Sequence, residues 1–158
     1  MCARYPDLRF VMGIAGDRRM RARETILQRL TLPPERWFSF VHASAMVSPS
    51  ARVGAGVVVM EQALVGPRCT IGDHVRLSAH VCIGHETVIA ARAVIAPAAT
   101  VSGRVRIGEG AYVGAAAAIA PDVTIGARAI VGIGAVVIDS VGAGAVVAGN
   151  PARPLRRK

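Results

Sequence analysis

Residues 71–95 read IGDHVRLSAHVCIGHETVIAARAVI, and every sixth residue of this stretch is aliphatic. The same period extends in both directions without a slip. The aliphatic positions are Val47, Val53, Val59, Val65, Ile71, Leu77, Ile83, Ile89, Ile95, Val101, Ile107, Val113, Ile119, Ile125, Val131 and Val137. The residue four places after each of them is small, and these are Ala51, Val57, Ala63, Cys69, Val75, Val81, Thr87, Ala93, Ala99, Val105, Ala111, Ala117, Val123, Ala129, Ala135 and Val141.

A period of six residues matches neither an α-helix nor a simple β-strand, which repeat at about 3.6 and 2 residues. It matches a short strand followed by a turn, with one large and one small residue of each unit pointing inward. The hexapeptide β-helix has this signature. We therefore predict an all-β fold, a parallel β-helix solenoid over residues 46–148, in which three units make one triangular coil. Because no unit holds an insertion, a functional site must lie on the faces, at the corners or between subunits.

The flanking segments follow other patterns. Residues 1–45 are expected to form a truncated α/β segment: a buried strand over residues 9–15, a helix capped by Asp17 that ends near Leu30, and a strand that includes Phe40. Residues 149–158 are expected to fold back and close the solenoid as a C-terminal tail. The prolines of that tail, Pro151 and Pro154, should not continue a strand ladder.

The formal net charge is +9, and Lys158 is the only lysine. An anion-binding surface and a general preference for arginine both explain this charge. No basic run is interleaved with aromatic residues, so we expect no nucleic-acid partner. Cys2, Cys69 and Cys82 form neither an even set nor a CxxC pair, which indicates a reducing cytoplasm. We expect no signal peptide and no membrane span.

The repeat, together with the GNPAR motif at residues 149–153, resembles the hexapeptide-repeat acyltransferases, whose β-helix is left-handed. Three stretches resemble more closely the nucleotide-sugar N-acetyltransferases and sialic acid O-acetyltransferases. They are FVMGIAGD (residues 10–17) with Arg21, VHASAMVSPSA (residues 41–51), and GHETVI (residues 84–89) followed by VSG (residues 101–103). The family's glycine-rich strand–turn–helix, which binds the nucleotide, is absent from this sequence. Val94 stands where a second histidine is frequent, and Ser78-Ala79 replaces a polar pair.

The resemblance implies an enzyme that moves an acetyl group from acetyl-CoA to an amine or hydroxyl of a nucleotide-linked or other sugar. Such a reaction needs a base for the acceptor's proton and donors for the oxyanion that forms. The matched motif makes His85 the general base and Glu86 its partner. It places Gly103, Ala115, Pro121 and Arg153 among the coenzyme A-binding residues, and it implies no metal. A homotrimer with active sites between subunits is also implied.

The repeat gives this assignment a geometric basis. Gly103 follows His85 by 18 residues, which is one coil, so the two should stack about 4.8 Å apart. A glycine there permits close approach of a thioester to the backbone amide. Glu86 can reach the imidazole of His85 only at a corner, because strand neighbours point to opposite faces. Without the resemblance, an exposed turn histidine and a turn glycine are alternative explanations of these residues.

An outward apolar stripe of Ala115, Ala116 and Ala118 also requires a cover. We expect a neighbouring subunit to supply it, with the pantetheine arm of coenzyme A in the same groove.

Two other functions remain open at this stage. A γ-carbonic anhydrase-like metalloenzyme shares the β-helix, and His80 and His85 have the spacing of its close histidine pair. Two coils before His80, however, lies Ser44, and His42 misses that column, whereas catalytic zinc takes three protein ligands. A non-catalytic trimeric scaffold is the second alternative. The sequence leaves N- or O-acylation, the acceptor sugar and the acyl length open.

Overall fold

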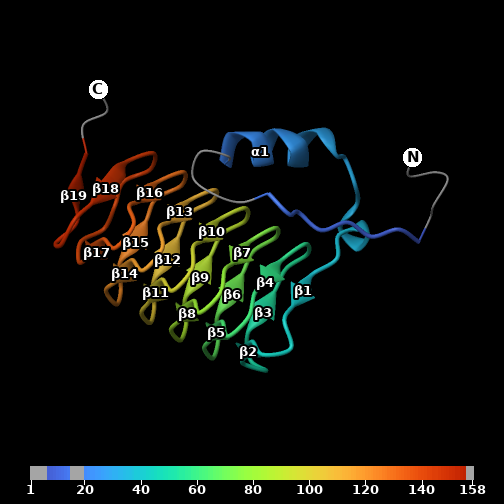
Figure 1. Cartoon of the computed structure of the whole chain (residues 1–158), viewed down its shortest axis with the longest axis horizontal. Coiled ribbons are helices and arrows are strands. Elements are labelled where there is room, and N and C mark those ends of the chain that lie inside the picture. Colours follow the sequence, from blue (N-terminus) through green and yellow to red (C-terminus); the bar gives the residue numbers. More distant parts are fainter. Residues whose placement is uncertain (1–6, 15–19, 156–158) are drawn as a thin grey trace.

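The computed structural model describes residues 7–14 and 20–155. Their strands wind into a solenoid with three flat faces, and helix α1 (Met20–Arg29) lies along one side of it (Figure 1). The predicted parallel β-helix is confirmed. No helix in these residues is long and apolar enough to cross a membrane.

Each face of the solenoid is one sheet. Sheet one contains β1 (Phe40–Val41), β4 (Val58–Val59), β7 (Arg76–Leu77), β10 (Val94–Ile95), β13 (Tyr112–Val113), β16 (Ile130–Val131), β18 (Val146–Ala148) and β19 (Arg153–Pro154). Sheet two contains β2 (Met46–Val47), β5 (Leu64–Val65), β8 (Cys82–Ile83), β11 (Thr100–Val101), β14 (Ala118–Ile119) and β17 (Val136–Val137). Sheet three contains β3 (Arg52–Val53), β6 (Thr70–Ile71), β9 (Val88–Ile89), β12 (Arg106–Ile107) and β15 (Thr124–Ile125).

The register of the sheets repeats every 18 residues. In sheet two, for example, β8 pairs in parallel with β11, with Cys82 opposite Thr100 and Ile83 opposite Val101. Residues one coil apart therefore lie in the same column, separated by about one strand spacing of 4.8 Å. This register decides which side chains meet at the candidate site.

The corners of the solenoid use left-handed backbone geometry. Every sixth residue from Gly56 to Gly134 has a positive φ, between 54° and 65°, although most of these residues are not glycine. The corner N–H groups are bonded to the previous coil. Those of Glu86 and Arg104, for example, donate to the carbonyls of Pro67 and His85 at 2.9 and 2.8 Å. These bonds offset the roughly 1–2 kcal/mol that a left-handed L-residue costs.

The core is a stack of thin aliphatic layers. The inward positions of the repeat from Val57 to Val137 are at most 5% exposed. Large and small positions alternate along each coil, and because residues one coil apart share a column, aliphatic residues stack on aliphatic residues and small residues on small residues from layer to layer. A core built this way needs few aromatic residues, in agreement with the composition.

The N-terminal segment differs in part from the prediction. The described part of residues 9–15 forms a single bridge, Phe10 with Trp37, and Val11 is exposed, so the expected buried strand is wrong there. The helix is present but ends at Arg29, and a short 3₁₀ helix follows at Pro34–Arg36. Asp17, the expected cap, lies outside the described residues.

Arg23 of α1 is one of the side chains that hold the segment to the solenoid. This side chain is 2% exposed and donates to the backbone carbonyls of His74 and Arg92. Burial, together with the charges of Arg76 and Arg92, lowers the pKa of Arg23 to about 10. The guanidinium therefore stays charged at neutral pH while it ties α1 to two consecutive coils.

The C-terminal tail folds back as predicted. Strand β19 pairs antiparallel with β18, with Val147 opposite Pro154. Pro154 therefore belongs to the ladder after all, which corrects the sequence-based expectation. It is tolerated because β19 is the edge strand of sheet one.

Candidate active site

The corner between β8 and β9 carries His85 and Glu86. Nδ1 of His85 lies 3.0 Å from Oε2 of Glu86, and both side chains are partly open to solvent. The contact is possible because Glu86 has a φ of 59°, which turns its side chain out of the strand alternation. A carboxylate accepts the proton on Nδ1 and so fixes the tautomer that leaves the Nε2 lone pair free.

Gly103 lies one coil further, in the column of His85. A Cβ built on Gly103 would lie 2.5 Å from Nε2 of His85, so the ring rests directly against the glycine Cα. The N–H of Gly103 has no acceptor among the described residues. The predicted stacking of His85 and Gly103 in one column is confirmed by this geometry.

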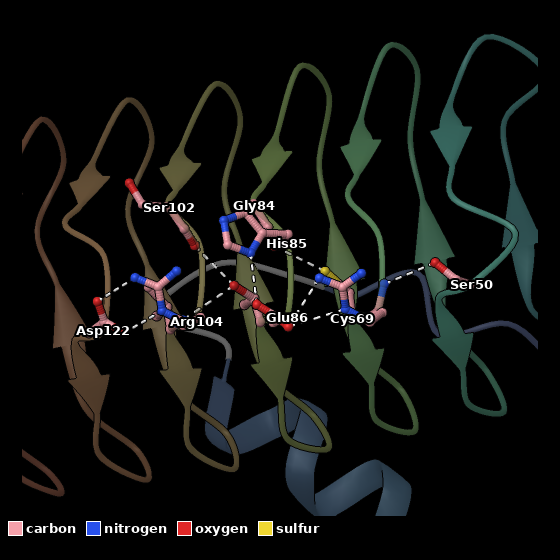
Figure 2. Close-up of polar contacts among 11 residues, drawn as sticks. Ser50, Cys69, Gly84, His85, Glu86, Ser102, Arg104 and Asp122 are labelled. Atoms are coloured by element: carbon pink, nitrogen blue, oxygen red, sulfur yellow. Dashed lines mark hydrogen bonds and ion pairs between the residues drawn. The ribbon is translucent and has the colours of Figure 1, made fainter.

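Glu86 is held from its other side by Arg68, one coil before it. Nε and Nη2 of Arg68 both lie 3.1 Å from Oε1 of Glu86. Oε2 of the same carboxylate faces His85 (Figure 2). The hydrogen bond with His85 and then those with Arg68 lower the pKa of Glu86 below its usual range. Glu86 therefore remains a carboxylate, able to accept the Nδ1 proton, well into the acidic range.

The same column continues as a second ion pair. Arg104 donates to both carboxylate oxygens of Asp122 at 2.6 and 2.7 Å. This pairing lowers the pKa of Asp122 and raises that of Arg104. Glu86, Arg104, Arg106 and Asp122 line an open hollow beside the imidazole. The hollow offers both charges to a polar acceptor molecule.

The other predicted coenzyme A residues are spread along the solenoid. Pro121 lies one coil beyond Gly103 in the same column, and the N–H of Asp122 next to it donates to the Gly103 carbonyl at 3.2 Å. Arg153 lies at the C-terminal end, 3.7 Å from the carboxylate of Asp139. Ala115 lies at another corner, between β13 and β14, so a single chain does not bring it to His85.

The remaining histidines are distributed over the solenoid. His80 lies at the corner before β8 and His85 at the corner after it, so one strand separates the pair. His42 bonds Ser44 near the first coil. Within residues 7–14 and 20–155, no three His, Cys, Asp or Glu side chains are close enough to hold a metal ion.

Arg68 and the Arg104–Asp122 pair were not predicted from the sequence. The signal was present in the repeat, because Ser50, Arg68, Glu86, Arg104 and Asp122 follow one another at intervals of one coil. Their alternating charges in one column could have been read from that spacing. The orientation of each side chain could not be read from the sequence, because it depends on the left-handed backbone at the corners.

The comparisons with known proteins match the fold of this chain. The family model "Bacterial transferase hexapeptide (six repeats)" matches residues 50–85. A histidine-to-asparagine variant of perosamine N-acetyltransferase from Caulobacter crescentus, in complex with CoA and GDP-perosamine, is 32% identical with a TM-score of 0.87. That match covers 99% of this chain and 73% of the other. This chain belongs to the hexapeptide-repeat sugar acetyltransferases.

Two further solved structures are similar to this chain. The acetyltransferase domain of PglB from Neisseria gonorrhoeae, in complex with acetyl coenzyme A, is 34% identical with a TM-score of 0.81. The match covers 92% of this chain and 71% of that one. WeeI from Acinetobacter baumannii is 28% identical with a TM-score of 0.80, and the match covers 86% of this chain and 66% of that one. No curated protein sequence matches the chain significantly. The left-handed parallel β-helix expected of these acetyltransferases is thereby confirmed.

Proposed function

We propose that this chain transfers the acetyl group of acetyl-CoA to the amine of a nucleotide-linked sugar, with His85 as general base. The observation that carries the proposal is the arrangement around one imidazole. Glu86 holds Nδ1, and Nε2 lies against Gly103, whose N–H is free. Similar structures are sugar N-acetyltransferases with CoA and GDP-perosamine bound, which favours an amine over a hydroxyl as acceptor.

The residues divide the reaction between them. As the acceptor nitrogen attacks the thioester carbonyl, a new C–N bond forms and Nε2 of His85 takes the departing proton. The negative charge that develops on the carbonyl oxygen is stabilised by the N–H of Gly103. The C–S bond then breaks, and the coenzyme A thiolate leaves with a proton from the imidazolium. No residue forms a covalent intermediate, so Cys82 has no part in it.

Acetyl-CoA fits the residues along the His85 column. Gly103 provides a site where any side chain would collide with the imidazole, and Pro121 extends the column one coil further. Arg153, near the end of the column, is a cation suited to a phosphate of coenzyme A. We assign these residues and Ala115 to coenzyme A binding, with Ala115 contributed by a neighbouring subunit.

The faces of the solenoid support a homotrimer. On sheet one, the outward residues Val58 and Val94 are buried, whereas sheet three presents mainly arginine and threonine. The outward column of sheet two is largely apolar: Met46, Leu64, Cys82, Thr100, Ala118 and Val136. Met46 is 69% exposed in the single chain. A neighbour packed on sheet two would lie beside the His85 corner, which joins sheets two and three, and would place the site in a cleft between subunits. The location that we propose for this trimer is the cytoplasm.

The proposal is tested by incubating the purified chain with acetyl-CoA and a panel of nucleotide-linked amino sugars. We expect thiol release and a product that has gained one acetyl group. Matched acceptors with a hydroxyl in place of the amine, and amino sugars without the nucleotide, define the acceptor. If acetyl-CoA binds but no amino sugar in the panel is acetylated, the proposal fails and a non-catalytic scaffold is favoured.

A further inference from the structure

Thr87 is an exception within the core. It occupies one of the small inward positions of the repeat, which otherwise hold alanine, valine or cysteine, and it is 0% exposed. Valine has the same shape and would fill the position without a polar atom. A buried hydroxyl is unfavourable unless it forms hydrogen bonds, so its bonds indicate what Thr87 does.

The hydroxyl of Thr87 closes the corner that carries Gly103. Its Oγ1 donates to the carbonyl of Ser102 at 2.9 Å and accepts the N–H of Val105 at 3.3 Å. These two backbone groups flank Gly103 and Arg104. One side chain in the core therefore holds both ends of the outer corner.

The bond to Ser102 also orients the Gly103 amide. The Ser102 carbonyl and the Gly103 N–H belong to the same planar peptide unit, and in a trans peptide they point in opposite directions. Since the carbonyl points inward to Thr87, the N–H must point outward, toward the surface on which His85 lies. The same hydroxyl thus aims the backbone donor that we assign to the acyl oxygen.

The layer below has an equivalent contact. Sγ of Cys69 donates to the carbonyl of Gly84 at 3.0 Å, across the same separation in sequence, and Gly84 precedes His85 (Figure 2). Burial raises the pKa of the Cys69 thiol, which keeps this donor protonated. The other members of the column, Ala51, Val105, Val123 and Val141, have no donor side chain. Side-chain donors therefore occur in this column only at the two layers of the candidate site.

We propose that Thr87 is a positioning residue of the acetyl-transfer site, whose hydroxyl fixes the Ser102–Gly103 peptide so that the Gly103 N–H meets the acyl oxygen beside His85. This inference rests on the proposed function. It adds a residue that touches neither substrate but determines how well the transition state is stabilised.

Thr87→Val is the decisive variant because it removes the hydroxyl and keeps the shape. We expect kcat to fall by about tenfold or more, toward the loss seen when an oxyanion donor is removed, with the KM for acetyl-CoA within about twofold. Thr87→Ser restores the hydroxyl and should recover most of kcat. Val123→Ala, two coils away in the same column, is the matched control: it lowers thermal stability and leaves kcat unchanged well below its Tm. A Thr87→Val enzyme with wild-type kcat, or a Thr87→Ser enzyme as slow as Thr87→Val, overturns the proposal.

A second measurement does not depend on turnover. In spectra of ¹⁵N-glycine-labelled protein, the Gly103 amide is identified by its loss in Gly103→Ala. We expect this resonance to shift in Thr87→Val and to return in Thr87→Ser, and an unchanged resonance in Thr87→Val would overturn the positioning role. If the wild-type chain acetylates no sugar, the proposed function fails by itself and the glycine spectrum alone decides the role of Thr87.

Discussion

The imidazole of His85 rests on the Cα of Gly103. A Cβ on residue 103 would lie 2.5 Å from Nε2, 2.8 Å from Cε1 and 2.9 Å from Cδ2 of the ring. Real Cβ atoms essentially never approach other atoms below 3.0 Å. The position therefore tolerates only glycine as long as the ring keeps this place, and the candidate base and the candidate oxyanion donor depend on each other sterically.

Gly103→Ala should accordingly displace the imidazole and crowd the acyl site. We expect kcat to fall by at least about 100-fold, comparable to the loss of an oxyanion donor. Steady-state kinetics with acetyl-CoA and the best acceptor measure this. Gly142→Ala is the control, because nothing lies within 4 Å of a Cβ there and its φ is not in the left-handed region. Equal activities of the two variants would show that the contact has no catalytic importance.

Arg68→Gln should weaken the hold on Glu86 without unfolding the chain. Because both side chains are exposed, we expect little change in thermal stability and a roughly two- to tenfold loss of kcat. Glu86→Gln should lose more, since it replaces the charged acceptor of the Nδ1 proton with a neutral amide. Arg128→Gln, which breaks the surface pair with Glu24, is the matched control.

The double variant Arg68→Gln/Glu86→Gln separates a shared role from two independent ones. If Arg68 acts through Glu86, the double variant is no slower than Glu86→Gln alone. If the fold losses of kcat in the two single variants multiply in the double variant, Arg68 contacts a substrate instead.

His74 should make the attachment of the N-terminal segment sensitive to pH. Its ring contacts Trp37 at a centroid distance of 4.6 Å, and its Nδ1 is buried without a partner. Burial, then the charge of Arg23, lowers the pKa of His74, with Asp73 opposing and Arg92 adding to the effect. Below the usual value of about 6.5, the unfolded chain therefore binds more protons than the folded one. The neutral ring of His74 therefore stabilises the fold fully above a pH of about 6.5. This stabilisation is lost as the pH falls through the lowered pKa of His74.

Thermal unfolding between pH 8 and pH 5 measures this. We expect Tm to fall by a few degrees over the acidic part of the range, with Trp37 fluorescence as a local probe. His74→Gln should flatten this part of the curve. Gln62, at another corner, shows that glutamine accepts the left-handed backbone, with a φ of 55°. A His74→Gln curve as steep as that of the wild type would assign the acid sensitivity to other groups.

The sequence predicts the solenoid well because every unit of the repeat contains the same two features, an aliphatic residue and a small residue at fixed spacing. The column of His85 and Gly103 follows from the repeat length alone. Thr87 appeared as one more small residue, and its meaning became clear only when its hydroxyl was seen against the Ser102 carbonyl.

Predictions outside the repeat were less successful for physical reasons. The segment around Phe10 is apolar, but tertiary contact with Trp37 gives it one bridge instead of a strand. Pro154 joins a ladder because it lies at an edge. The partnership of Arg68 with Glu86 depends on two left-handed corners, which residue type did not reveal because most corner residues are not glycine.

The most direct test of the account is His85→Ala, with acetyl-transfer kinetics and coenzyme A binding measured on the same preparation. Removal of a general base typically costs about 10²–10⁴-fold in rate. We predict a loss of kcat in that range, with a coenzyme A Kd within about twofold of the wild type and an unchanged circular dichroism spectrum. Turnover at the wild-type rate in this variant would contradict the account.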